Sequence, residues 1–97
     1  MEKLHLDQEK LEMAAGKLRA ISHPVRIAIL DMLHDNTLNV TEIVERLKIE
    51  QAAASHHLNI LKNKGVLASQ RRGTKIYYSL KHQSLVEIID CINRCHE

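Results

Sequence analysis

Apolar side chains recur every three or four residues along most of the chain, which is the period of a helix that buries one face. This pattern predicts five helices, over residues 7–21, 24–34, 40–47, 51–64 and 83–95. Two shorter stretches alternate between apolar and polar positions on either side of Gly73, and they predict antiparallel strands over 66–71 and 75–80. The chain is therefore expected to be mainly α-helical, with one small antiparallel β-hairpin before the last helix.

The ends of several helices carry their own signals. Pro24 stands at the first position of the second helix, where a missing amide hydrogen costs nothing. Asn39 and Glu42, three residues apart, form a capping pair for the third helix. Gly65 supplies the left-handed stop after the fourth helix. Because 97 residues leave no room for a second core, residues 1–97 are expected to form a single domain.

The fourth helix has two contrasting faces. The apolar face, expected to pack on the core, comprises Ile49 in the preceding turn together with Ala53, Leu58 and Leu61. The other face carries short polar side chains of the kind that contact base edges, namely Gln51, Ser55, His56 and Asn59. The hairpin that follows has a cationic tip, residues 71–75. A winged helix-turn-helix protein binds duplex DNA with a polar-faced helix and the basic hairpin that directly follows it. The sequence therefore predicts a DNA-binding regulator.

The distribution of charge supports this interpretation. Residues 48–78 contain six Lys or Arg and one Glu, whereas the rest of the chain contains eight cations and eleven anions. A basic stretch by itself would be an ordinary solvated surface. Here the positive charge coincides with the predicted reading helix and hairpin, and it is the electrostatic footprint expected of a phosphate-binding surface.

Other functional classes fit the sequence less well. The chain contains no Gly-rich phosphate loop, no Gly-x-Ser-x-Gly elbow and no His-Glu-x-x-His pair, so an enzyme is not expected. A winged-helix module that contacts RNA or another protein is the alternative. The small polar face at residues 51–56 favours a DNA major groove, because A-form RNA hides that edge from a helix.

Composition also bears on where the protein acts. The longest apolar runs are far shorter than a membrane span, and the N-terminal residues lack the apolar core of a secretory signal. Two cysteines on such a chain indicate a reducing compartment rather than a structural disulfide. The protein is therefore expected to be cytoplasmic, without a membrane partner.

Four segments in the right order carry a resemblance to a known family. They are Ile21–Leu30 (ISHPVRIAIL), Ile49–Leu58 (IEQAAASHHL), Leu61–Leu67 (LKNKGVL) and Arg71–Leu80 (RRGTKIYYSL). Together they resemble the ArsR/SmtB family of small winged helix-turn-helix repressors, over nearly the whole chain. The resemblance implies a regulator of transcription that binds double-stranded DNA.

The resemblance also implies a symmetric homodimer joined through the first and last helices. The residues agree, because both helices carry an apolar stripe that a small monomer would struggle to cover. In the first helix the stripe contains Leu4, Leu11 and Leu18, and in the last it contains Leu85, Ile88, Ile89, Ile92 and Cys95. A two-fold protein of this kind is expected to bind an inverted repeat with half-sites about one helical turn apart.

The family motif can be carried onto individual residues. Base contacts are expected from Gln51, Ala52, Ser55 and His56. Phosphate contacts are expected from Lys62 and Lys64 and from the wing residues Arg71, Arg72 and Lys75. Ala52 stands where the family often has Ser or Pro, so packing on a thymine methyl would replace one polar contact. His57 is expected to be packed or hydrogen-bonded inside the protein, while Arg26 fits either a phosphate contact or a structural ion pair.

Many members of the family sense a metal or metalloid, but their known sites are poorly matched here. Residues 38–44 contain no cysteine, which excludes a thiolate site in the third helix. The positions of the zinc-type site in the last helix are occupied by His82, Ser84 and Cys95, and only two of these can ligate. No classical zinc site is therefore expected.

The remaining candidates for sensing are Cys91, Cys95 and His96. The two thiols are four residues apart, so on a helix they project to the same side. They fit a soft metal or metalloid ion, a reversible disulfide, or simple packing on the dimer stripe. A constitutive repressor without any effector also fits. His5, His23 and His34 have no partner at a recognisable spacing, so surface or capping roles are expected for them.

Overall fold

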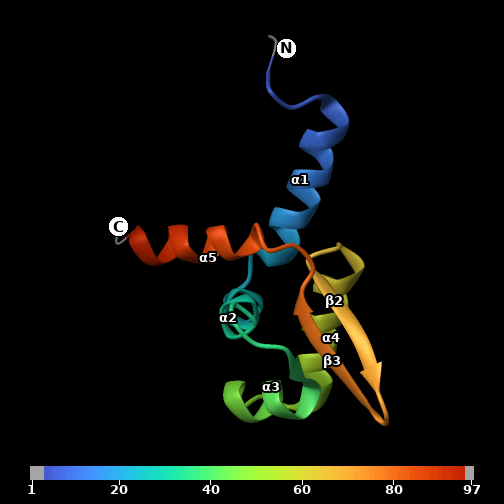
Figure 1. The fold of residues 1–97 in the computed structure, drawn as a ribbon. Coiled ribbons are helices and arrows are strands. Elements are labelled where there is room, and N and C mark those ends of the chain that lie inside the picture. Colours follow the sequence, from blue (N-terminus) through green and yellow to red (C-terminus); the bar gives the residue numbers. More distant parts are fainter. Residues whose placement is uncertain (1–3, 96–97) are drawn as a thin grey trace.

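The computed structural model describes residues 4–95, which form seven main elements and one very short strand (Figure 1). The elements are α1 (Gln8–Ile21), α2 (Pro24–Met32), β1 (Leu38–Asn39), α3 (Val40–Leu47), α4 (Gln51–Asn63), β2 (Leu67–Arg72), β3 (Lys75–Leu80) and α5 (Leu85–Arg94). Helices α2, α3 and α4 and the sheet form the body of the protein, and α1 and α5 project from it in different directions (Figure 1). Among these elements, no helix is long and apolar enough to cross a membrane.

The predicted order of helices and hairpin is confirmed, and the boundaries differ by a few residues. Helix α1 begins at Gln8 because Asp7 is its N-cap, with a side-chain oxygen 2.9 Å from the amide of Lys10. Helix α2 ends at Met32 rather than residue 34, since the amide of His34 bonds three residues back to Asp31. Helix α5 begins only at Leu85 and ends at Arg94.

The sheet contains one strand more than the sequence predicts. Residues Leu38 and Asn39 pair antiparallel with Tyr78 and Tyr77, so the strand order is β1-β3-β2. Two residues are too few to show an alternating pattern, which explains why this strand was missed. Its consequence is structural, because β1 attaches the start of α3 to the same sheet that carries the hairpin.

The predicted caps are present. The imidazole Nδ1 of His23 accepts a hydrogen bond of 3.1 Å from the amide of Val25, immediately after the turn into α2. Asn39 and Glu42 form a complete capping box, in which both side-chain to backbone distances are 2.9 Å. These bonds determine where α2 and α3 begin, and so where the helix-turn-helix starts.

The hydrophobic core contains side chains from the helices and from the sheet. Its fully or nearly fully buried members include Ile29, Leu30, Leu38, Ile43, Leu58, Leu61, Val66, Leu67, Tyr78 and Ile89. One sequence prediction was wrong: Ala53 is exposed, and Ala54 is the buried alanine of α4. The reason is helical phase, because residues 54, 58 and 61 follow the i, i+4, i+7 repeat, whereas residue 53 lies well outside that stripe.

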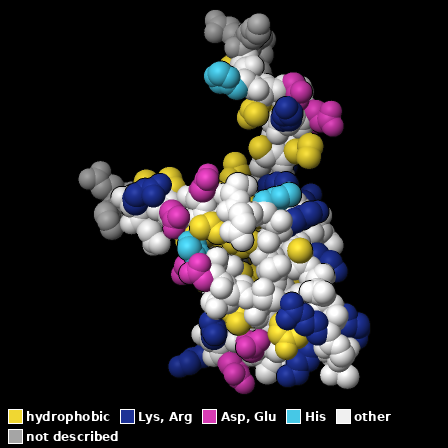
Figure 2. All heavy atoms as spheres, in the orientation of Figure 1, with side chains coloured by type: hydrophobic (Ala, Val, Ile, Leu, Met, Phe, Trp, Pro, Cys, Tyr) yellow, Lys and Arg dark blue, Asp and Glu magenta, His cyan; other side chains and the backbone are white. Residues whose placement is uncertain are grey.

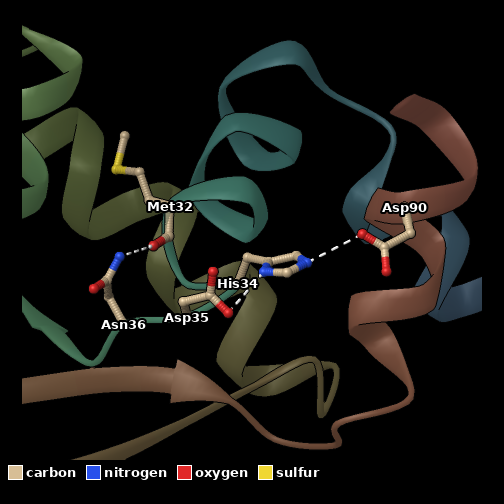
Figure 3. Close-up of polar contacts among 5 residues, drawn as sticks. All are labelled: Met32, His34, Asp35, Asn36 and Asp90. Carbon is tan, nitrogen blue, oxygen red and sulfur yellow. Dashed lines mark hydrogen bonds and ion pairs between the residues drawn. The ribbon is translucent and has the colours of Figure 1, made fainter. Parts of the chain in front are cut away.

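A polar cluster links the end of α2 to α5 (Figure 3). His34 Nε2 lies 3.2 Å from a carboxylate oxygen of Asp90, and its Nδ1 lies 3.0 Å from one of Asp35. The hydrogen bond with Asp90, followed by that with Asp35, raises the pKa of His34. The protonated imidazole therefore favours the attachment of α5, and this contribution is lost as the pH rises through the raised pKa. The sequence offered no sign of it, since Asp90 lies 56 residues from His34.

Candidate nucleic-acid interface

Helix α4 presents its polar face to solvent on the side away from the core. Of the predicted base-contacting residues, Gln51, Ala52 and His56 are exposed and Ser55 is half-buried. The neighbouring Asn59 is also exposed. These side chains share one face because the opposite one is anchored by the buried stripe of α4, so the helix offers a row of small polar groups with a rigid support.

The first turn of α4 has free hydrogen-bonding capacity. Its N-cap, Glu50, has extended backbone angles but makes no side-chain capping bond. The first amides of a helix have no partner inside the helix, and they carry the positive end of its dipole. This end of α4 therefore suits the approach of a phosphate alongside Gln51.

The structure brings the hairpin tip beside the start of α4. Gln51, Thr74 and Lys75 line one open hollow, together with Thr41 from the first turn of α3. Two predicted contacts from separate segments, one for a base and one for a phosphate, are thus neighbours. Thr41 was missed by the sequence analysis, because only the pairing of β1 with β3 places the start of α3 beside the hairpin.

The wing residue Arg72 is held in position by its own strands. Its guanidinium carbon lies 4.8 Å from the centre of the Tyr77 ring, a cation–π arrangement. One of its terminal nitrogens donates to the side-chain oxygen of Gln70 at 3.3 Å. Since Arg71, Arg72 and Lys75 are all exposed, the hairpin tip offers three cations to a DNA backbone.

The other two predicted phosphate contacts lie elsewhere. Lys62 and Lys64 are exposed at the C-terminal end of α4, about 20 Å along the helix from Gln51. Lys64 borders a hollow with Lys17 and Arg19 of α1. Figure 2 shows Lys and Arg side chains both around the lower end of the hairpin and higher up, near the base of α1. Lys75 of the wing therefore lies at the start of α4, whereas Lys64 lies at its other end with Lys17 and Arg19.

A second polar cluster lies where α4 meets α2. Arg26 donates from Nε to Nδ1 of His57 and from a terminal nitrogen to the backbone oxygen of Ala20, both at 3.1 Å. The predicted hydrogen-bonded role of His57 is confirmed. Of the two roles weighed for Arg26, the structure favours the internal one, with an imidazole and a carbonyl as partners in place of a carboxylate.

The two cysteines of α5 are both exposed and free, with Cys95 at the C-cap of the helix. The neighbouring Cys91 side chain raises the pKa of the Cys95 thiol. His96 lies outside the described residues. Within residues 4–95, no three His, Cys, Asp or Glu side chains are grouped so as to hold a metal ion.

The fold and this surface define a winged helix-turn-helix protein. Residues 23–69 match the family model described as "Bacterial regulatory protein, arsR family". The chain belongs to this arsR family and is therefore a DNA-binding regulator of transcription, not an enzyme, as the sequence predicted.

Curated relatives extend the match beyond the family model. The HTH-type transcriptional regulator NmtR of Mycobacterium tuberculosis is 35% identical over 85 residues, which are 88% of this chain and 71% of the relative. The transcriptional repressor PagR of Bacillus anthracis is 36% identical over 89 residues, 91% of this chain and 89% of the relative. The transcriptional repressor SdpR of Bacillus subtilis is 42% identical over 72 residues, 74% and 80% of the two chains.

Solved structures agree with the sequence relatives. HlyU from Vibrio cholerae superposes with a TM-score of 0.85 at 29% identity, covering 93% of this chain and 98% of the other. A form of the same protein described as reduced gives 0.82 at 29% identity, with 92% and 94% covered. The repressor PagR gives 0.82 at 36% identity, with 90% and 100% covered.

Proposed function

We propose that this protein is a homodimeric repressor that binds an inverted-repeat operator through α4 and the wing. The single observation that carries the proposal is the hollow that Gln51 shares with Thr74 and Lys75. This proximity would let α4 contact the base edges of one half-site in the major groove while the wing contacts the adjacent phosphate backbone. PagR and SdpR, both named as repressors, support the direction of regulation.

The dimer rests on apolar surface that the single chain leaves uncovered. The large apolar side chains exposed among the described residues are Leu4, Leu6, Met13, Leu18 and Ile92. All lie in or just before α1 or in α5, the two helices that project from the body (Figure 1). In a two-fold symmetric dimer, a single interface with a second copy would cover the apolar surface of both helices.

The operator can be found by selecting tight binders from random DNA duplexes with the purified reduced protein. We expect an imperfect inverted repeat with half-sites about 10 base pairs apart, centre to centre. Binding to it should weaken as salt is added, because Lys and Arg release counterions from the backbone. Failure to select any duplex, or a preference for single-stranded or structured RNA, would overturn the proposal.

Two substitutions on the reading face test the base contacts. Gln51→Ala and His56→Ala are each expected to cost about 1–3 kcal/mol on the selected operator, because each removes a hydrogen bond to a base edge. Affinity for random duplex should stay close to that of the wild type. Fluorescence anisotropy with both duplexes measures this difference. An equal loss on both would mean that these side chains only position the protein on the backbone.

One substitution on the wing tests the phosphate contacts. Arg72→Ala is expected to weaken binding to operator and random duplex alike, and to reduce the slope of log affinity against log salt by about one. The measurement is a salt titration with each duplex. Gln70→Ala is the matched control, since it removes the neighbour of Arg72 without removing charge. A loss confined to the operator, with an unchanged slope, would contradict the wing assignment.

For the effector, we propose a thiol-reactive or soft-metal signal at Cys91 and Cys95. The exposure of both free cysteines and their spacing of four residues support a shared site, since soft ions prefer thiolates. Two alternative hypotheses are that the protein is a constitutive repressor without an effector, and that the two cysteines only pack against a partner chain.

The effector proposal predicts a conditional loss of operator binding. Arsenite, zinc or a mild oxidant should release the reduced wild-type protein, and the variant carrying both Cys91→Ser and Cys95→Ser should stay bound under the same treatment. Without any agent the two proteins should bind equally, because both thiols are exposed. Titrations of each agent against preformed complexes provide the test. Release of the double variant would place the sensor elsewhere, and no release of the wild type would leave a constitutive repressor.

A further inference from the structure

We infer that Arg26 and neutral His57 are positioning residues for DNA reading, because their hydrogen bond holds the reading face of α4 at the correct rotation. This inference rests on the proposed reading of an operator by α4. It assigns a function to two residues that would not themselves contact the DNA.

The side chains of Arg26 and His57 connect three helices. Arg26 stands in the first turn of α2, and its guanidinium reaches both His57 on α4 and the backbone oxygen of Ala20 at the end of α1. Three helices therefore meet at one guanidinium. Two directional bonds to a planar donor restrict the rotation of α4 in addition to its apolar contacts, since hydrogen bonds require a particular geometry.

The hydrogen bond reaches α4 next to its reading face. The buried residues Ala54, Leu58 and Leu61 hold one side of the helix against the core. His57 directly follows His56, whose ring is exposed for reading, and the two ring centres are 5.6 Å apart. A small rotation of α4 at His57 would therefore move His56 and Ser55 off the base edges, where hydrogen bonds tolerate little misplacement.

The bond between Arg26 and His57 requires a neutral imidazole. Nδ1 of His57 accepts from Arg26, so it must carry no proton. Burial, followed by the nearby His23, Arg26 and His56, lowers the pKa of His57. The ring of His23 lies 4.6 Å from that of His57, and the ion pairs found within residues 4–95 do not involve Arg26. His23 and Arg26 thus face His57 from the α2 side, and His56 faces it from α4 itself.

At low pH the protein is therefore expected to lose its selectivity for the operator over random DNA. A proton on Nδ1 would replace the hydrogen bond by two like charges, those of the imidazolium and the guanidinium, without a carboxylate to offset them. Because the pKa of His57 is lowered, the connection is intact at neutral pH and is lost as the pH falls through that lowered value. Random binding depends on the wing and backbone charges, so it should not be lost with it.

The test compares two variants of His57 with the wild type. In His57→Asn the amide oxygen takes nearly the place of Nδ1 and accepts from Arg26 without ever being protonated. His57→Leu fills a similar volume but offers no acceptor. The measurement is the ratio of affinities for the selected operator and for random duplex, from about pH 8 to about pH 5 at constant ionic strength. Urea unfolding shows that each variant is folded.

The expected results differ for the three proteins. The wild type should lose selectivity by about tenfold in acid, the scale of one charge-assisted hydrogen bond. His57→Asn should keep neutral-pH selectivity at every pH, and His57→Leu should be about tenfold less selective throughout. Nitrogen chemical shifts of the His57 ring should report the Nε2–H tautomer at neutral pH.

Two outcomes would overturn the inference alone. Full selectivity in His57→Leu would show that the bond does not position α4. The same acid loss in His57→Asn as in the wild type would show that protonation of His57 is not responsible. If the wild type selects no duplex at any pH, the proposed function fails and the inference fails with it.

Discussion

Ile92→Glu is expected to convert the protein to a monomer and to weaken its binding to the full operator by about 10²- to 10⁴-fold. The side chain is 46% exposed in the single chain and borders an apolar hollow between α2 and α5, so a carboxylate there would be solvated in the monomer. In a dimer it would be buried without a partner. The large effect arises because a dimer binds its second half-site intramolecularly, whereas a monomer must bind each half-site from solution.

The measurement combines light scattering on a sizing column with anisotropy on duplexes that carry one or two half-sites. The variant should bind a single half-site as well as the wild-type protein does at low concentration. Leu18→Glu on α1, where the side chain is 58% exposed, should have the same effect. Thr37→Glu adds the same charge to an exposed loop and serves as the control. A dimeric Ile92→Glu protein with normal operator affinity would show that α5 is not in the interface.

Leu58→Ala is expected to lower the free energy of unfolding by about 2–5 kcal/mol. Leu58 is fully buried at the centre of the stripe by which α4 packs on the core. Truncation removes apolar contacts and leaves a cavity that the surrounding helices cannot fill completely. For a domain whose total stability is about 5–15 kcal/mol, this is a large fraction.

Urea unfolding followed by circular dichroism, at one fixed protein concentration, measures the loss. Asn59→Ala is the matched control, because it lies next to Leu58 on the exposed face and should change stability by less than about 0.5 kcal/mol. Folded Leu58→Ala protein should still select the same operator, since no DNA contact is removed. A loss as small as that of the control would mean that α4 is not anchored through Leu58.

The pKa values of His34 and His57 are shifted in opposite directions. His34, between Asp35 and Asp90, is stabilised in its protonated form (Figure 3). His57, beside Arg26, is stabilised in its neutral form. If the Arg26–His57 bond positions α4 as we infer, the attachment of α5 and the orientation of α4 should have different pH dependences.

Much of the fold was predictable because it depends on local pattern. The 3.6-residue period, Pro24, the Asn39–Glu42 pair and Gly65 identify the helices and their order before any contact is known. The reading face of α4 and the basic hairpin also follow from neighbouring residues, since they need only the period of one helix and the charge of one turn. The end of α2 was predicted two residues too late, because the amide of His34 bonds to the backbone oxygen of Asp31 and the helix stops at Met32.

By itself, the sequence determined the class of the protein, the helix proposed to read DNA and the charge of the wing, because each is a property of adjacent residues. Only the tertiary structure decided which side chains meet across long separations. It paired β1 with β3, set Gln51 beside Lys75, joined Arg26 to His57 and His34 to Asp90, and separated Lys64 from the wing. The physical reason is that a helical period specifies the face on which a residue lies, whereas its partner on another element depends on how all the elements pack together.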